Sequence, residues 1–127
     1  WFGEEARQRF WDSEFVVTPK SDRMGLRLSG VAIELEERRE MISEPVAFGS
    51  VQVPPDGQPI VLLADRQTLG GYPKIATVIS ADAPALARLR PGQRVAFGQV
   101  SLVEAQYHRM VMDTAFAALR AGLAEKS

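Results

Sequence analysis

Two short polar segments carry most of the side chains that could bind a small acid or amide. The first is Ser21–Gly25, and the second runs from Asp65 to Lys74. Each segment places an Asp-Arg dipeptide at the boundary of an apolar stretch that is predicted to be a strand. An arginine guanidinium presents a planar fork to a carboxylate, phosphate or carbamate group. We therefore interpret the two segments as a candidate site at the mouth of a β-barrel, where polar groups can orient a small ligand.

The candidate residues differ in the chemistry that they offer. Arg66 can anchor an anion, and Lys74 offers a movable point charge, so these two are the catalytic candidates. Amide and hydroxyl side chains supply neutral donors and acceptors, and the glycine pair lets backbone amides approach a bound anion closely. The substrate-binding candidates are Asp22, Arg23, Gln52, Asp65, Gln67, Thr68, Gly70, Gly71 and Tyr72.

A purely structural interpretation explains the same residues. Asp-Arg pairs commonly join strand ends through ion pairs and caps, and glycine pairs commonly make turns. By spacing alone, Asp22-Arg23 and Asp65-Arg66 fit both interpretations, because clustered charges mark function only statistically. Lys74 taken alone is typical of an exposed surface lysine.

Several other chemistries are excluded by composition. The chain has no cysteine and a single histidine, His108, so no zinc site and no metal ligand set is expected. No nucleotide-binding glycine loop of the Walker type is present. The formal net charge is -1, with 15 basic and 16 acidic residues, so no nucleic-acid partner is expected. No apolar run has the length of a membrane span, and we expect a cytoplasmic protein with no membrane partner.

Short apolar stretches with turn residues between them predict the elements that must position these side chains. Alternating patterns predict strands at 15–18, 24–29, 31–35, 50–53, 58–63, 74–79 and 94–97. Pro54–Gly57 predicts a hairpin turn. Helices are predicted at 4–11, at 83–89 after an Asp82 cap, and from Ser101, where a capping box begins, to about Gly122. The fold class is therefore mainly β, a closed antiparallel barrel with short helices and a C-terminal helix.

Three ordered blocks resemble one known family: Ser21–Leu28, Val51–Ile60 and, above all, Ala64–Ile75. The chain is similar to the biotin-dependent carboxyltransferase-like family, also called allophanate hydrolase subunit 2. The resemblance implies a cyclophilin-like β-barrel. It also implies that residues 1–127 are a single domain, the C-terminal half of a carboxyltransferase-like subunit whose N-terminal half is missing here.

The family resemblance implies a function and several partners. The favoured expectation is the C subunit of an ATP-dependent 5-oxoprolinase, which helps to convert 5-oxo-L-proline to L-glutamate. ATP is then a cofactor of the complex, and the partner is a subunit-1 homologue that is either the 5-oxoprolinase B subunit or kinase-inhibitor-like. One alternative is the carboxyltransferase component of a urea carboxylase system, with biotin as a cofactor. Another is a non-enzymatic regulator that antagonises a histidine-kinase inhibitor. We expect the isolated chain to be inactive.

Overall fold

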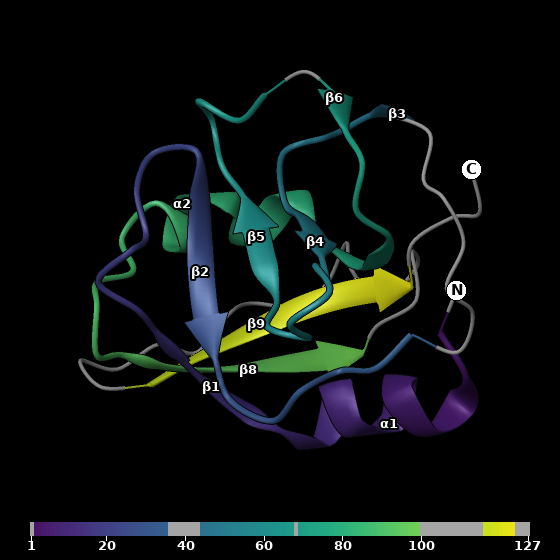
Figure 1. Ribbon diagram of the computed structural model, residues 1–127. Helices are drawn as coiled ribbons and strands as arrows, with labels where there is room; N and C mark the ends of the chain where they lie inside the picture. The colour runs from purple at the N-terminus through teal and green to yellow at the C-terminus, as the bar shows by residue number, and fades with distance from the viewer. Residues whose placement is uncertain (1, 36–43, 68, 100–115, 124–127) are drawn as a thin grey trace.

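The computed structural model describes residues 2–35, 44–67, 69–99 and 116–123 (Figure 1). Seven strands form a closed barrel in the order β1-β2-β5-β4-β7-β9-β8. Neighbouring strands are antiparallel, except that β8 and β9 run parallel. The strand bounds, in barrel order, are Glu14–Val17, Gly25–Ser29, Ile60–Leu62, Ser50–Gln52, Lys74–Val78, Phe116–Leu123 and Arg94–Gln99. The predicted β-barrel is thereby confirmed.

The turn at Pro54–Gly57 joins β4 and β5 as the sequence predicts. The two strands pair antiparallel, with Val51 opposite Val61. Gly57 has φ of 78°, which is a left-handed conformation that glycine adopts without a side-chain penalty. Its amide donates to the carbonyl oxygen of Pro54 over 2.9 Å. This hairpin sets the register of the strands that lead to the candidate site.

The strand predicted at 31–35 is wrong. These residues adopt no regular secondary structure, although Ile33 is buried. The amide of Ile33 donates to the carbonyl oxygen of Gly57 over 2.9 Å and takes part in no strand ladder. The alternating pattern therefore indicated a buried side chain correctly but not a strand. The hairpin turn at Gly57 accepts the backbone hydrogen bond that a neighbouring strand would otherwise accept.

The predicted C-terminal helix is wrong where the structure describes it. Residues 116–123 form β9, and residues 101–115, with the capping box and His108, lie outside the described residues. β9 pairs with β8 on one side and with β7 on the other. Leu119 and Ala121 are both buried, which matches the two-residue period of a strand. Closure of the barrel thus overrides the helical preference of an alanine-rich segment.

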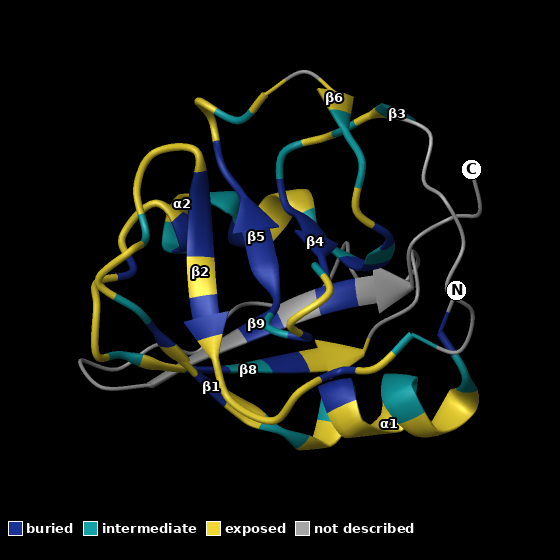
Figure 2. Ribbon diagram, viewed as in Figure 1, coloured by how far each residue is buried: buried dark blue, intermediate teal, exposed yellow. Residues whose placement is uncertain are grey.

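Helix α1, Glu4–Asp12, packs its buried Phe10 against the barrel beside β8, at the bottom of Figure 1. The rings of Phe10 and Phe97 stack with centroids 4.6 Å apart, and Phe15 of β1 lies 6.0 Å from both. These aromatic contacts join α1 to two strands of the barrel. Figure 2 shows the buried residues running along the strands and into one side of α1.

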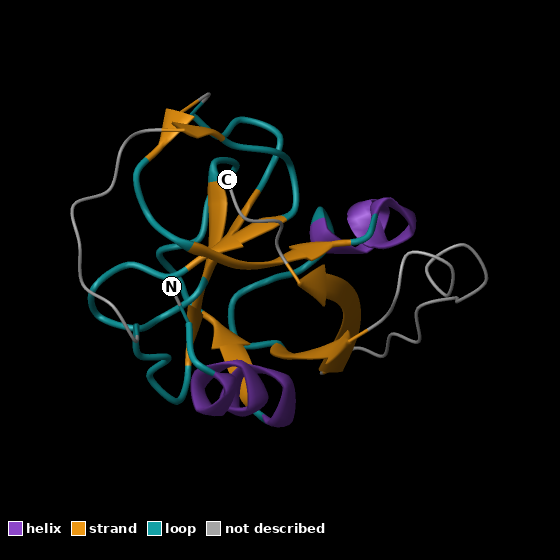
Figure 3. Cartoon of the chain, turned by 90° about the vertical axis from the view of Figure 1, so that its right-hand side faces the viewer, coloured by secondary structure: helices purple, strands orange, loops and turns teal. Residues whose placement is uncertain are grey.

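The second helical segment is shorter than predicted. It consists of a 3-10 turn, η1, at Ser80–Asp82, followed by α2 at Ala83–Leu86, on the opposite side of the barrel from α1 (Figure 3). The side chain of Asp82 is buried but makes no capping hydrogen bond, so the predicted capping role is wrong. Among the residues that the structure describes, no helix is both long enough and apolar enough to cross a membrane.

We expect Gly57→Ala to destabilise the protein more than Gly92→Ala. Both glycines have positive φ, and the conformational penalty alone is about 1–2 kcal/mol. A Cβ at Gly57 would also lie 2.9 Å from the Ala32 Cβ and 3.0 Å from the Ile33 nitrogen, whereas one at Gly92 meets nothing within 4 Å. Denaturant unfolding of both variants measures the difference. Equal losses of stability would show that Ala32 and Ile33 move without cost to make room for the new methyl group, which contradicts the prediction.

Candidate functional site

The two Asp-Arg segments lie side by side because the hydrogen bonds between β2 and β5 continue beyond the strand ends. Gly25 and Leu62 are the last register pair of the two strands on this side. After it, the Leu63 amide donates to the Met24 carbonyl, and the Asp65 amide donates to the Arg23 carbonyl, each over 3.1 Å. The sequence prediction that the two segments converge is therefore correct at the level of the backbone.

Asp22 closes the turn before β2. Its Oδ1 accepts from the Met24 amide at 2.8 Å and from the Gly25 amide at 3.3 Å. Its own amide donates to the carbonyl oxygen of Gly25 over 3.1 Å. This geometry is the structural alternative raised by the sequence, since the carboxylate uses its acceptor capacity on nearby backbone.

Arg66 is half-buried and joined to two backbone carbonyls. Its Nε donates to the Val46 carbonyl at 3.2 Å, and its Nη1 donates to the Leu63 carbonyl at 3.3 Å. Val46 follows β3, Glu44–Pro45, which pairs with β6, Leu69–Gly70, in a small two-stranded sheet separate from the barrel. The guanidinium thus joins this small sheet to the end of β5. In the part of the chain that the structure describes, its other N–H groups make no further hydrogen bond.

A cavity of about 490 Å³, here called the Arg66 cavity, gathers most of the predicted site. Seven predicted residues line it: Asp22, Gln52, Arg66, Gln67, Gly70, Gly71 and Tyr72. The sequence analysis missed its other lining residues, which are Met24, Gly25, Arg27, Val46, Ile60, Leu62 and Leu69. Apart from the cation Arg27, these are apolar residues or glycine, so no side-chain chemistry in the sequence indicated them.

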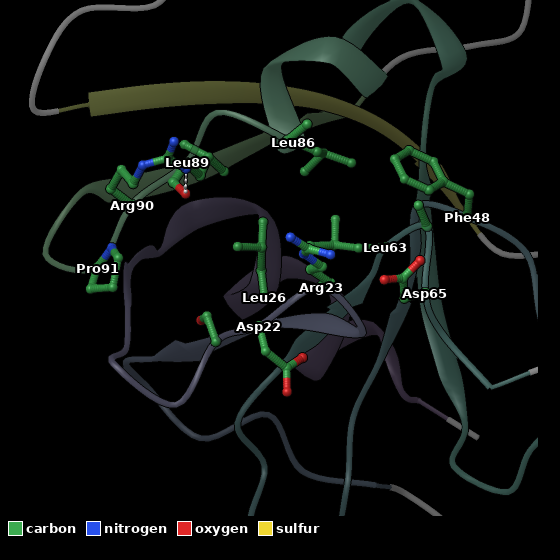
Figure 4. A pocket seen from close by; sticks show the side chains of 13 residues that line it. Asp22, Arg23, Leu26, Phe48, Leu63, Asp65, Leu86, Leu89, Arg90 and Pro91 are labelled. Atoms are coloured by element: carbon green, nitrogen blue, oxygen red, sulfur yellow. Dashed lines mark hydrogen bonds between the residues drawn. The ribbon is translucent and has the colours of Figure 1, made fainter.

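A second cavity of about 490 Å³, the Arg23 cavity, lies between the ends of β2 and β5 and helix α2 (Figure 4). Leu26, Leu63, Leu86 and Leu89 give it an apolar interior, and Arg23 and Asp65 line it together with Arg90. Arg23 and Asp65 therefore belong to a different cavity from Arg66, while Asp22 lines both. Arg90 was missed because it follows α2, far along the chain from the two polar segments.

The remaining candidates stand apart from these cavities. Lys74 is half-buried at the start of β7 and lies opposite Gln52 in the β4–β7 register, but it lines neither cavity. Thr68 lies outside the described residues. In the described part of the chain, no group of three or more His, Cys, Asp or Glu side chains could hold a metal ion.

The carboxyltransferase domain family, in its description "subdomain A and B", matches residues 1–99. This chain belongs to that family. The family resemblance inferred from the three sequence blocks is therefore confirmed.

Two relatives are named as the C subunit of 5-oxoprolinase. The protein from Haemophilus influenzae is 52% identical over 104 residues, and the one from Escherichia coli K12 is 45% identical over 104 residues. Each match covers 82% of this chain and 34% of the relative. The chain thus spans about a third of the length of these relatives. Among solved structures, the Kluyveromyces lactis urea carboxylase shares the fold, with a TM-score of 0.77 and 24% identity over 83% of this chain and 10% of that one.

The contacts of Asp22 predict a stabilising role that needs an acceptor and not a charge. Asp22→Ala removes the partner of two amides and should lower the free energy of unfolding by about 1–2 kcal/mol. Asp22→Asn keeps an oxygen at the same position and should retain most of that stability. Thermal unfolding of the three proteins tests this. If Asp22→Asn is as unstable as Asp22→Ala, the charge is needed for stability and the prediction is wrong. If Asp22→Asn keeps the stability of the wild type but abolishes ligand binding, the carboxylate also serves the site directly.

Proposed function

We propose that this chain is part of the C subunit of an ATP-dependent 5-oxoprolinase, in which it helps partner subunits to convert 5-oxo-L-proline to L-glutamate. The observation that carries the proposal is the identity of 52% and 45% to two proteins of that name. ATP then acts at the level of the complex. The partners are a homologue of the 5-oxoprolinase B subunit or of a kinase inhibitor, and the N-terminal half of the same C subunit, all in the cytoplasm.

The Arg66 cavity is the proposed substrate site. 5-Oxoproline is a small ring with a carboxylate and a lactam carbonyl, so it requires one cationic anchor and neutral hydrogen-bonding groups. Arg66 lines the cavity as the anchor, and Gln52 and Gln67 line it as neutral groups. Lys74 is the first residue of β7 and lies opposite Gln52 of β4 without lining the cavity, and it is the proposed movable charge. Donors held in place, such as the guanidinium of Arg66, stabilise the negative charge that develops on a carbonyl oxygen during ring opening.

A carboxyltransferase role is the second candidate. The shared fold with the Kluyveromyces lactis urea carboxylase favours it, and biotin would then be the carrier of the carboxyl group. A ureido group and a lactam both present a planar amide carbonyl, so the same cavity suits either ligand.

An ATP-dependent 5-oxoproline hydrolysis assay on the full-length protein with its partners tests the proposed function. We expect turnover by the complex, and none by this chain alone, because no nucleotide-binding loop of the Walker type occurs in the sequence. Biotin-dependent carboxylation of urea without 5-oxoproline hydrolysis would replace the first candidate with the second. ATP hydrolysis by the isolated chain would contradict the proposal that ATP acts only at the level of the complex.

Replacing Arg66 should reduce turnover of the complex sharply. Loss of a charge-assisted hydrogen bond corresponds to about a 10- to 150-fold fall in kcat/KM for Arg66→Ala. Arg66→Lys should recover only part of this, because an ammonium group lacks the two-pronged geometry.

A matched control and a stability measurement separate binding from scaffold roles for Arg66. Arg88 is exposed and lines neither cavity, so Arg88→Ala should leave turnover unchanged. Arg66→Ala also loses two bonds to backbone carbonyls, so its melting temperature should fall. If Arg66→Ala melts early yet turns over normally in the cold, Arg66 is only scaffold.

A further inference from the structure

Gln52 is a buried polar side chain with an unused donor. It lies at the end of β4 and is 5% exposed, and its Nε2 is itself shielded from solvent and has no hydrogen-bond partner among the described residues. Leaving a buried donor unpaired costs free energy, and native proteins rarely do so without a reason. The arrangement therefore indicates that an acceptor from outside the described chain completes this group.

The neighbouring glycine makes room for the Gln52 amide. A Cβ at Gly70 would overlap Gln52 Nε2 and lie 2.8 Å from Val46 Cγ1. Gly70, Gln52 and Val46 all line the Arg66 cavity. A side chain at position 70 would displace the donor, so the glycine and the glutamine form one steric unit at this wall of the cavity.

Val46 connects this unit to the guanidinium of Arg66. Its side chain lies beside Gly70, while its carbonyl oxygen accepts from Arg66 Nε at 3.2 Å. The cavity is therefore lined by a carboxamide and a cation on either side of Val46. Its other walls include Ile60 and Leu62, which are both buried and apolar.

Part of the rim of the Arg66 cavity is apolar and half exposed, beside the exposed polar residues Asp22, Arg27 and Gln67. Met24, Leu69 and Tyr72 are 45%, 53% and 46% exposed, and all three line the cavity. Large apolar side chains left open to solvent around a cavity suit a ligand with apolar faces. The lining thus fits a flat ring that carries its polar atoms at the edge.

From these contacts we propose that the Gln52 carboxamide turns about its last bond, so that Nε2 enters the Arg66 cavity and donates to the carbonyl oxygen of a planar lactam or ureido group, while Arg66 binds an anionic group on the same ligand. The lactam form of this proposal rests on the proposed function. The unpaired donor supplies the selectivity for a carbonyl, because a ligand without an acceptor leaves the buried amide unsatisfied.

Three ring compounds separate the two interactions. 5-Oxo-L-proline carries both the carbonyl and the carboxylate, 2-pyrrolidinone carries only the lactam, and L-proline carries the carboxylate without the lactam carbonyl. Each is titrated by calorimetry into the full-length protein in complex with its partners. Gln52→Met should weaken both lactams by about 2- to 13-fold and leave L-proline unchanged. Arg66→Ala should weaken 5-oxo-L-proline and L-proline and leave 2-pyrrolidinone unchanged.

The direction of the stability change distinguishes a ligand-binding role from a structural one. Gln52→Met removes a buried unpaired donor and keeps the length of the side chain, so the melting temperature of the ligand-free protein should stay the same or rise. If Gln52 has a structural role instead, Gln52→Met should lower the melting temperature. Gln99 is exposed at the end of β8 and lines neither cavity, so Gln99→Met is the matched control.

Gly70→Ala tests the steric unit independently. It should weaken lactam binding as Gln52→Met does, because the new methyl group displaces the amide. In the Gln52→Met background, Gly70→Ala should add little further loss of lactam binding. Full additivity of the two losses would show that the glycine and the glutamine act separately, which contradicts the proposal.

The outcomes separate this inference from the proposed function. If the complex hydrolyses 5-oxo-L-proline but Gln52→Met binds both lactams normally, the inference is wrong and the function stands. If the complex does not hydrolyse 5-oxo-L-proline, yet urea or 2-pyrrolidinone binding depends on Gln52, the function is wrong and the inference stands. If the wild-type complex binds neither lactam nor urea, both are overturned.

Discussion

The hydrogen bonds that continue from the β2–β5 ladder past both strand ends position the whole polar region. Through them the backbone at Arg23 and Met24 lies against that at Leu63 and Asp65. Consecutive residues then point to different sides, so Arg66 reaches one cavity while Arg23 and Asp65 reach the other. A short piece of backbone pairing thus decides which charged groups can share a ligand. The small β3–β6 sheet depends on the same region, because Arg66 holds Val46 in place.

Local signals in the sequence identified the elements that are determined by the residues within them and next to them. The Pro54–Gly57 turn and helix α1 needed only neighbouring residues, and both are present. Strand β9 could not be found in this way. An alanine-rich segment favours a helix by its own propensity, and only pairing with the edges of β7 and β8, which are distant in sequence, selects the strand. Ile33 shows the converse case, in which a strand-like pattern receives its partner from a turn.

The candidate site was predictable where side-chain chemistry alone marks a residue. Arg66, Gln67 and the glycine pair stood out by type and do line one cavity. The division into two cavities was not predictable, because it depends on which face of the β2–β5 connection each side chain occupies. The role of Val46 was also not predictable, since it contributes a backbone carbonyl oxygen, which every residue possesses. For Gln52, the sequence offered a polar residue near a turn, and only the structure shows that its donor is buried without a partner among the described residues.

The two bonds from Arg66 to backbone carbonyls have a thermodynamic consequence for recognition. A free arginine side chain gives up about 2 kcal/mol of rotamer entropy when it is immobilised. Here the protein has already restricted the side chain during folding, so binding of the proposed anion does not incur that loss again. A guanidinium held in this way offers its remaining N–H groups in a fixed direction. Under the proposed function, association at this wall of the cavity is governed by the fit of the ligand to a rigid fork, and not by the capture of a mobile charge.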